Sequence, residues 1–444
     1  MNTHKPFLAK LSILVSLVAA PCLLLAQQTP SIVWQRCLGG TNYEGPGGAR
    51  SIQQTHDGGY IVIGTTSSID GDVIGYHGDS VHDDIWVVKL DSARKIQWQR
   101  CLGGRGYDEG TSIIQTSDKG YALCGHTNSD SEDVSGNHGN YDAWVVKLDS
   151  GGKTQWQQCL GGSGSDYANS IIQNSQGDYI IAGTTASHDE SLNNHGGEDA
   201  YIIKLSSSGN IIWQKCFGGS RNEYASSIIQ TKDGGYIFTG VTNSTDGDVL
   251  GYHPDTTATS DTILGPYHNS DVWVVKLDTS GKIQWQKCLG GAKNDEANSI
   301  LQTSDKGYIL CGSTTSDDGD ITGWHSGWEM GEYPSHPYPD VWIIKLDSVG
   351  SIQWQNCFGG TGEDWGSDVI PTFDGGYIFT GSTASNDGDV TGRHAVFLNP
   401  DPDMWVGKLT VLAEAAMKEV IRSFKLPTEV MLSMAVQLLL MATL

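Results

Sequence analysis

The sequence predicts an all-β protein, a single β-propeller built from four-stranded antiparallel blades. Three observations lead to this prediction. The chain of 444 residues repeats one block six times. Each block holds four short runs rich in Ile, Val, Tyr and Trp, separated by Gly, Asp and Ser turns, as is typical of β-strands. A four-stranded repeat of roughly 40–70 residues matches a propeller blade, whereas the coils of a β-solenoid are shorter.

Residues 1–26 are typical of a secretory signal peptide. Lys5 and Lys10 precede an apolar run from Leu11 to Ala26, and polar residues follow it. A basic start, an apolar centre and a small residue at the end mark a cleavable export signal. We therefore expect cleavage after Ala26. Lipidation at Cys22 is the alternative, which the apolar residues after it fit badly.

Residues 27–410 consist of the repeated block. Its clearest marker is the motif W-Q-x-C-[LF]-G-G, which predicts one strand of each blade. An S-I-I-Q-T strand, a D-G-G-Y turn with the strand after it, and a D-x-W-V-V-K-L-D strand follow, for example at 112–116, 233–240 and 142–149. The first marker begins at Trp34, Trp98, Trp156, Trp213, Trp285 and Trp354.

The ends of the repeat region predict how the ring closes. The chain enters the pattern inside a W-Q-x-C strand at 32–34 and leaves it after a D-x-W strand at 405–409. We expect the N-terminal strand to complete the last blade, because this pairing removes two open sheet edges. Six copies of each strand then give six blades.

The D-G-G-Y, D-x-W-x-x-K-L-D and W-x-x-x-x-G-G signatures resemble the β-propeller repeat proteins that Gram-negative bacteria secrete. The resemblance covers about residues 28–410. It implies a propeller fold and no particular activity. Many proteins of this kind carry a C-terminal sorting domain for type IX secretion, which implies an extracellular or cell-surface location, with the periplasm as the alternative.

Residues 411–444 depart from the pattern and are rich in Ala, Met and Leu. Read one frame over, their codons allow an S-I-I-Q-T-T-D-G-G-Y sequence, and the in-frame text at 374–390 begins with the same D-G-G-Y. We therefore interpret the tail as a frameshifted further repeat, so that an intact gene product would contain seven or more blades. A terminal amphipathic helix is the alternative. The apolar part at 430–444 is too short and interrupted for a membrane span.

The charge balance restricts the partners of the protein. The chain carries 27 Lys and Arg against 51 Asp and Glu, a formal net charge of -24. Such an acidic chain is repelled by nucleic acids and by anionic membrane surfaces. We expect a monomer without membrane insertion that binds a polysaccharide or a surface protein.

Two acidic positions recur in every block, at the strand ends where the long loops gather. A residue that repeats in all blades is more often structural, and we interpret both acids as acceptors that lock turns. The first set follows each Gly-Gly by four residues: Glu44, Asp108, Asp166, Glu223, Asp295 and Asp364. The second set opens each D-x-W strand: Asp84, Asp142, Asp199, Asp271, Asp340 and Asp403.

A D-G-D-[VI]-x-G-x-H motif in the long loops is the candidate metal site. Closely spaced carboxylates with Gly suit oxygen-ligated Ca2+, although the spacing is not that of an EF-hand. A solvated turn is the alternative, and no other cofactor is expected. The histidines of the motif lie in six different blades and cannot converge on one zinc ion. The candidate Ca2+ ligands are Asp246, Asp248, Asp318, Asp320, Asp387 and Asp389.

Aromatic residues outside the repeat pattern give the candidate binding site. They fall in the longer loops of blades four to six or beside the recurring acids, on the face that we expect to bind. Aromatic rings near acids and hydroxyls suit stacking against sugars or contact with a protein. The alternative is that these loops only fold back over the ring. The candidates are Trp324, Trp328, Tyr333, Tyr338, Tyr267 and Trp365.

The cysteines indicate packing rather than chemistry. Six of them occupy one repeat position, and equivalent positions in separate blades lie too far apart for disulfides. Contact of Cys124 or Cys311 with a neighbouring cysteine is the alternative.

No catalytic constellation stands out. The sequence contains no Ser-His-Asp spacing, nucleophile elbow or metal-ligand cluster, and we assign no catalytic residue. We therefore expect a non-catalytic secreted binding protein. The alternative is an extracellular glycoside hydrolase or lyase that uses Glu329 or Asp364 as an acid.

Overall fold

The computed structural model describes residues 34–44, 49–78, 82–189, 192–254, 269–325, 337–394 and 402–409. These residues form 23 β-strands, and no α-helix occurs among them, so the prediction of an all-β protein is confirmed. Accordingly, the described part of the chain offers no helix long and apolar enough to cross a membrane. The chain divides into two units, Met1–Gly39 and Gly40–Leu444.

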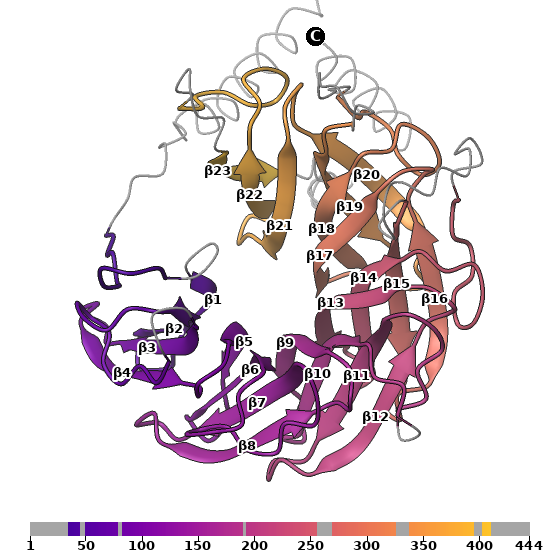
Figure 1. Ribbon diagram of the computed structural model, residues 1–444. Helices are drawn as coiled ribbons and strands as arrows, with labels where there is room; N and C mark the ends of the chain where they lie inside the picture. Colours follow the sequence, from indigo (N-terminus) through magenta and orange to yellow (C-terminus); the bar gives the residue numbers. More distant parts are fainter. Residues whose placement is uncertain are drawn as a thin grey trace, which may run out of the picture. The chain divides into compact units, whose positions relative to one another are not determined.

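The second unit contains six antiparallel sheets, each a meander of consecutive strands (Figure 1). The first sheet contains β1 (Ala49–Gln54), β2 (Tyr60–Thr66), β3 (Asp84–Leu90) and β4 (Ile96–Leu102). The second contains β5 (Asp108–Gln115), β6 (Tyr121–Thr127), β7 (Asp142–Leu148) and β8 (Thr154–Leu160). The third contains β9 (Asp166–Gln173), β10 (Tyr179–Thr185), β11 (Asp199–Leu205) and β12 (Ile211–Phe217).

The remaining sheets follow the same plan. The fourth contains β13 (Glu223–Gln230), β14 (Tyr236–Thr242), β15 (Asp271–Leu277) and β16 (Ile283–Leu289). The fifth contains β17 (Asp295–Gln302), β18 (Tyr308–Thr314), β19 (Asp340–Leu346) and β20 (Ile352–Phe358). The sixth contains β21 (Asp364–Pro371), β22 (Tyr377–Thr383) and β23 (Asp403–Leu409).

The sheets pack in chain order as the blades of a six-bladed β-propeller, as predicted. The second strand of each of the first five sheets contacts the first strand of the next sheet. Equivalent strands also share their register. For example, β13 shifts register against β14 between Ala225 and Ser227, and β17 shifts against β18 between Ala297 and Ser299. The repeated shift indicates that each block of sequence folds into the same unit.

The sixth sheet has three strands in the described part of the chain. The exposed fractions of Met404 and Val406 on β23 are 84% and 58%, whereas Val341 and Ile343 at the same positions of β19 are fully buried. The fourth strand was expected at 32–34, of which 32 and 33 lie outside the described residues and Trp34 is described without strand structure. Its pairing stays a prediction, and the tail at 411–444 also lies outside the described residues.

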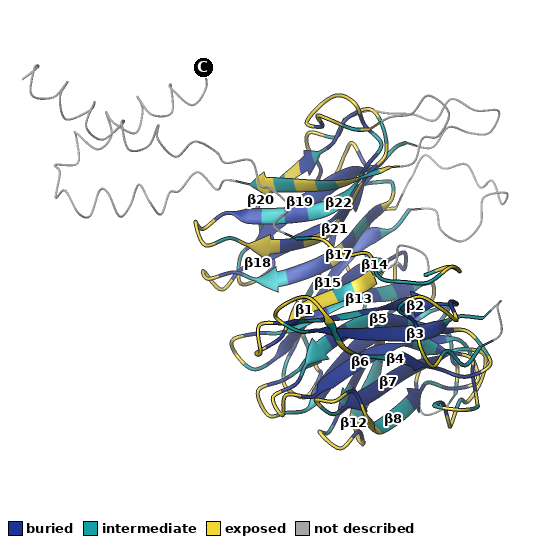
Figure 2. Ribbon diagram, turned by 90° about the vertical axis from the view of Figure 1, so that its left-hand side faces the viewer, coloured by how far each residue is buried: buried dark blue, intermediate teal, exposed yellow. Residues whose placement is uncertain are grey.

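The hydrophobic core lies between neighbouring sheets, and the second and third strands of the first five sheets are largely buried (Figure 2). Trp144, on the third strand of its sheet, is fully buried, and its indole N–H donates to Gln157 Oε1 at 2.7 Å. Trp156, from the next strand, packs edge-on against Tyr179 of the following blade. The tryptophans of the repeat therefore join strands within a blade and blades to one another.

The described cysteines are unpaired, and all of them except Cys37 are buried. Cys124 and Cys311 are fully buried and free, so the alternative of a disulfide at these two positions is wrong. Burial raises the pKa of the Cys124 thiol to about 12. A buried thiol that stays protonated packs as a small apolar side chain, as expected.

A buried lysine closes the tight turn at the other end of each of the first, second, fourth and fifth blades. In the first blade, Lys89 Nζ lies 2.9 Å from Asp57 Oδ2 and donates to the Leu90 carbonyl at 2.8 Å. A Cβ at Gly59 would stand 2.1 Å from the Leu90 carbonyl oxygen and 2.6 Å from that ammonium group, which explains the second glycine of the D-G-G-Y motif. The corresponding lysines are Lys147, Lys276 and Lys345.

Candidate binding face at the loop-rich strand ends

The first recurring acid of each blade is a hydrogen-bond acceptor that fixes the connection before it. Asp108 accepts the Gly104 N–H at 2.8 Å and the Ser129 hydroxyl at 2.8 Å, and the Thr127 hydroxyl also donates to it. All six acids accept the N–H of the glycine four residues earlier. The prediction that these acids lock turns is therefore confirmed. Since Asp364 is fully buried and has three such donors, it also belongs to the scaffold.

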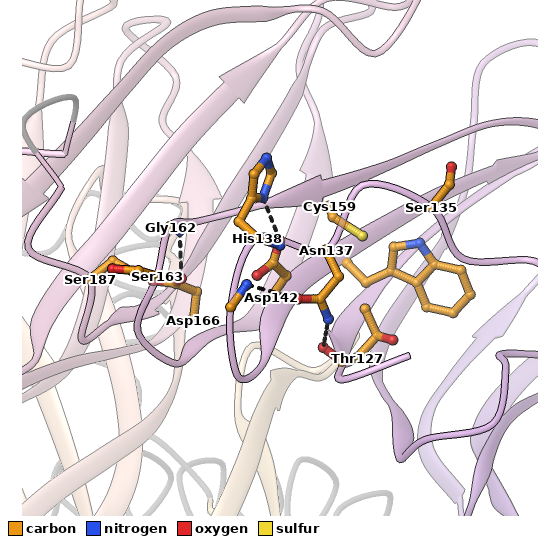
Figure 3. A network of polar contacts seen from close by, with 12 residues as sticks. Thr127, Ser135, Asn137, His138, Asp142, Cys159, Gly162, Ser163, Asp166 and Ser187 are labelled. Carbon is orange, nitrogen blue, oxygen red and sulfur yellow. Dashed lines mark hydrogen bonds and ion pairs between the residues drawn. The ribbon is translucent and has the colours of Figure 1, made fainter. Parts of the chain in front are cut away.

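The second recurring acid holds the histidine of the long loop. Asp142 Oδ2 lies 2.6 Å from His138 Nδ1 and accepts the His138 N–H at 3.1 Å (Figure 3). The same pair occurs in every blade, with Nδ1–Oδ2 distances of 2.6–3.0 Å. Each histidine therefore ties its loop to the first residue of the third strand in the same blade. The histidines are His77, His138, His195, His253, His325 and His394.

The two acids of neighbouring blades face one another at their junction. A Cβ at Gly103 would lie 2.8 Å from Asp84 Oδ1 and 2.5 Å from Asp108 Oδ2, so both oxygens approach the same point. Asp84 Oδ1 is buried without a hydrogen-bond partner among the described residues. Burial raises the pKa of Asp84 to about 6, and the charge of Asp108 adds to this shift. The Asp84 carboxyl therefore takes up its proton as the pH falls through about 6, at a higher pH than an exposed aspartate does.

The D-G-D motif packs against the Gly-Gly connection of its own blade. Asp246 Oδ1 accepts the Ser220 N–H at 2.7 Å, and Asp318 Oδ1 accepts the Ala292 N–H at 2.8 Å. Gly247 between the acids has a φ of +66°, which favours glycine. Among the described residues, no group of three or more His, Cys, Asp or Glu side chains is placed to hold a metal ion. Ca2+ binding at these loops stays a prediction.

The predicted aromatic site is described in part. Trp324 is half-buried against the core of the fifth blade, and its indole N–H donates to the Tyr338 carbonyl at 3.1 Å. Lys293 Nζ lies 5.1 Å from the centre of the Trp324 ring. Trp365 on β21 is 40% exposed. The structure thus brings Trp324 and Tyr338 together. Trp328, Tyr333 and Tyr267 lie outside the described residues.

A group of residues that the sequence analysis did not single out lies at the same strand ends. We call this group the rim cluster, and its residues come from three successive blades. Arg50 Nη2 lies 2.5 Å from Glu109 Oε1, and His126 Nε2 lies 3.8 Å from Glu109 Oε2. The His126 ring packs edge-on against the rings of Tyr141 and Tyr167, with centroid distances of 5.5 and 4.9 Å. The rim cluster consists of Arg50 on β1, Glu109 on β5, His126 on β6, Tyr141 before β7 and Tyr167 on β9.

One signal in the sequence marks these positions. Tyr167 directly follows Asp166, the first recurring acid of blade three, and Tyr141 directly precedes Asp142, the second recurring acid of blade two. Both positions change from blade to blade although the acids beside them recur. The residues after the first acid are Glu109, Tyr167, Tyr224, Glu296 and Trp365 in blades two to six. The residues before the second acid are Asp83, Tyr141, Glu198, Ser270, Pro339 and Pro402.

Two cavities lie near the junction of the first and second blades. One of about 430 Å³ is lined by residues that include His77, Arg100 and Asp133, and the other, of about 350 Å³, is lined by residues that include Asp57 and Lys89. His77 Nε2 lies 3.8 Å from Asp133 Oδ2. The second cavity is lined by Asp57 and Lys89, whose ion pair at the tight turn we call the lysine clamp, as we do its equivalents in the other blades. This cavity therefore lies at the tight-turn end of the strands.

Comparison with known proteins gives few relatives in sequence. No family model matches the chain. A curated protein, the regulatory protein FlaEY of Caulobacter vibrioides, is 26% identical over 194 residues. The match covers 38% of this chain and only 19% of FlaEY, so most of that protein has no counterpart here.

Solved structures give distant likenesses. A protein of unknown function from Dyadobacter fermentans matches with a TM-score of 0.44 at 10% identity over 84% of this chain and 96% of its own. The WD40 domain of Pan2 from Neurospora crassa has a TM-score of 0.41 at 11% identity, over 75% and 74%. A gluconolactonase from Xanthomonas campestris has 0.35 at 8% identity, over 78% and 96%. Likenesses at this level support no argument about function.

Proposed function

We propose that this protein is a secreted, non-catalytic propeller that binds a glycan or a protein at the loop-rich strand ends. One observation carries the proposal. The first recurring acids of blades two to six are fully buried and accept hydrogen bonds from backbone and hydroxyl donors. The residues that differ from blade to blade at the same face include partly exposed aromatics, such as Trp365 and Tyr167. A fixed scaffold with variable aromatic side chains suits binding.

We also propose that residues 1–26 direct export and that an intact form is displayed at the cell surface. The support is the signal-like N-terminus and the resemblance of the repeats to proteins exported by type IX secretion. Sequencing of the source DNA across codons 400–444 and beyond tests the second part. In-frame resumption of the repeat or a sorting domain would support surface display, whereas a confirmed stop would favour a released or periplasmic protein.

The binding proposal is tested on a panel of polysaccharides with wild-type protein. Retention without turnover supports the binding function, whereas release of reducing ends or unsaturated products would support the hydrolase or lyase alternative. The double variant Trp324→Ala/Trp328→Ala examines the long loop of the fifth blade. If it keeps every ligand that the wild type binds, that loop is not the binding site.

A further inference from the structure

The rim cluster carries no net charge that a ligand would have to neutralise. Arg50 and Glu109 form an ion pair, with side chains 41% and 26% exposed. Burial lowers the pKa of His126, so its imidazole is neutral at pH 7. Within the described part of the chain, His126 Nδ1 is a buried nitrogen without a hydrogen-bond partner.

The tyrosines supply an apolar surface beside these polar groups. The rings of Tyr141 and Tyr167 are stacked, with a centroid distance of 5.8 Å and an interplanar angle of 28°. His126 supports both rings edge-on, and all three side chains are only partly exposed. Aromatic side chains that are held by their neighbours lose little conformational freedom when a ligand binds.

We propose that the rim cluster binds an uncharged sugar unit of a glycan. The C–H face of a pyranose ring packs on the exposed tyrosine surface, and its hydroxyl groups bond to the Glu109 carboxylate and the Arg50 guanidinium. This proposal rests on the proposed binding function and specifies its ligand and its place. It assigns recognition to the blade junctions around Tyr167 rather than to the long loop of Trp324.

The charges around the cluster favour a neutral ligand over an anionic one. Asp83, Glu198 and Glu296 occupy the variable positions of neighbouring junctions, and the whole chain has a net charge of -24. A uronic acid polymer would approach this surface against repulsion. An unpaired cation would in turn compete with Arg50 for Glu109, which already accepts from it at 2.5 Å.

The test is native affinity electrophoresis of the full chain in gels that contain soluble β-glucan, galactomannan or xyloglucan, with alginate as the charged comparison. Tyr167→Ala removes the apolar surface, and Glu109→Gln removes the charged acceptor and serves as a second, milder variant. Trp324→Ala examines the long loop. Phe373→Ala is the matched aromatic control, because Phe373 is fully exposed in the tight turn at the opposite strand ends. Thermal melting checks that each variant is folded.

The expected result is retardation of the wild type by at least one neutral polysaccharide. Tyr167→Ala should weaken binding about tenfold or more, which is about 1.4 kcal/mol. Glu109→Gln should also weaken it, while Phe373→Ala and Trp324→Ala should not. If the wild type is retarded but Tyr167→Ala and Glu109→Gln bind normally, the rim cluster is not the site, although the binding function stands.

Two further outcomes overturn the inference in different ways. Retardation by alginate alone would contradict the neutral ligand. Absence of retardation by every polysaccharide would reject glycan recognition and leave only a protein partner for the proposed function.

Discussion

At the scale of single residues, the buried acids are the most informative feature of the molecule. Asp295 is fully buried and accepts the Gly291 N–H at 2.7 Å and the Ser316 hydroxyl at 2.9 Å, and the Thr314 hydroxyl also donates to it. Burial raises its pKa to about 7 despite these donors. The Asp295 side chain therefore stabilises the fold mainly by accepting hydrogen bonds, and its negative charge matters less.

Asp295→Ala should destabilise the protein by about 2–4 kcal/mol, because three buried donors lose their acceptor. Asp295→Asn keeps one acceptor oxygen and should cost less than half as much. Urea unfolding measures both. The matched control is Asp317→Ala in the following loop, whose carboxylate is 60% exposed and pairs with Lys293 at 3.3 Å. It should change the free energy of unfolding by less than about 1 kcal/mol. Equal losses for Asp295→Ala and Asp317→Ala would contradict the assignment.

The roles of the acids were predictable from the sequence to different degrees. Recurrence of Asp295 and its equivalents in every blade indicated a structural role, and the hydrogen bonds confirm it. The partner of each second acid was not predictable, because Asp84 lies seven residues after His77 whereas Asp271 lies 18 after His253. The rim cluster was missed because its members come from three blades, and only packing brings them together.

At the scale of elements, each blade is held at both ends of its strands by different devices. The loop-rich ends use buried acids, and the tight-turn ends use the lysine clamp. Strand positions and the tight turns followed from the sequence, because alternation and turn residues are local signals. The burial of Lys89, which is 2% exposed, was not foreseen, because a lysine within an apolar strand gives no sign of which face it takes.

Lys89→Met should destabilise the protein by about 1–3 kcal/mol, because the Leu90 carbonyl and Asp57 lose a donor. The hydrogen bonds from Thr55 and Lys89 hold the pKa of Asp57 at about 2, and the variant should move it back toward 3.8. Carboxyl NMR during acid titration and urea unfolding measure the two effects. Lys95→Met, an exposed lysine in the next turn, is the control and should change neither. An unaltered Asp57 pKa would show that the clamp does not act as described.

At the scale of the whole molecule, stability should depend on pH through two opposed groups of carboxyls. The acids at the blade junctions have pKa values raised by burial, to about 6 for Asp84 and about 7 for Asp295. Folding favours the protonated form of these carboxyls. Their contribution to the free energy of unfolding is therefore complete below about pH 4 and is lost as the pH rises through 6–7. The acids that pair with the buried lysines behave in the opposite way. Asp57, with a pKa of about 2, stabilises the folded state above pH 4, and this stabilisation is lost as the pH falls toward 2.

The melting temperature should therefore be highest at about pH 4–5 and fall toward both pH 2 and pH 8. The net charge of -24 at pH 7 adds repulsion on the alkaline side. Circular dichroism melting across this range measures the profile. In the variant Asp84→Asn/Asp295→Asn, the fall between pH 5 and pH 8 should become smaller. A wild-type melting temperature that is highest at pH 8 would contradict the conclusion that folding favours the protonated form of the junction carboxyls.

The arrangement shared by the junctions between consecutive blades has a consequence for how the sequence of such a chain can vary. At the five junctions between consecutive blades, an Asp that pairs with a loop histidine meets the first acid of the next blade, which accepts the N–H of the glycine four residues before it. Because the repeats share this layer, exchange of one blade for another would change variable positions such as Tyr167 or Trp365 and keep the interlocking layer. The variable positions of the surface can then change independently of the scaffold.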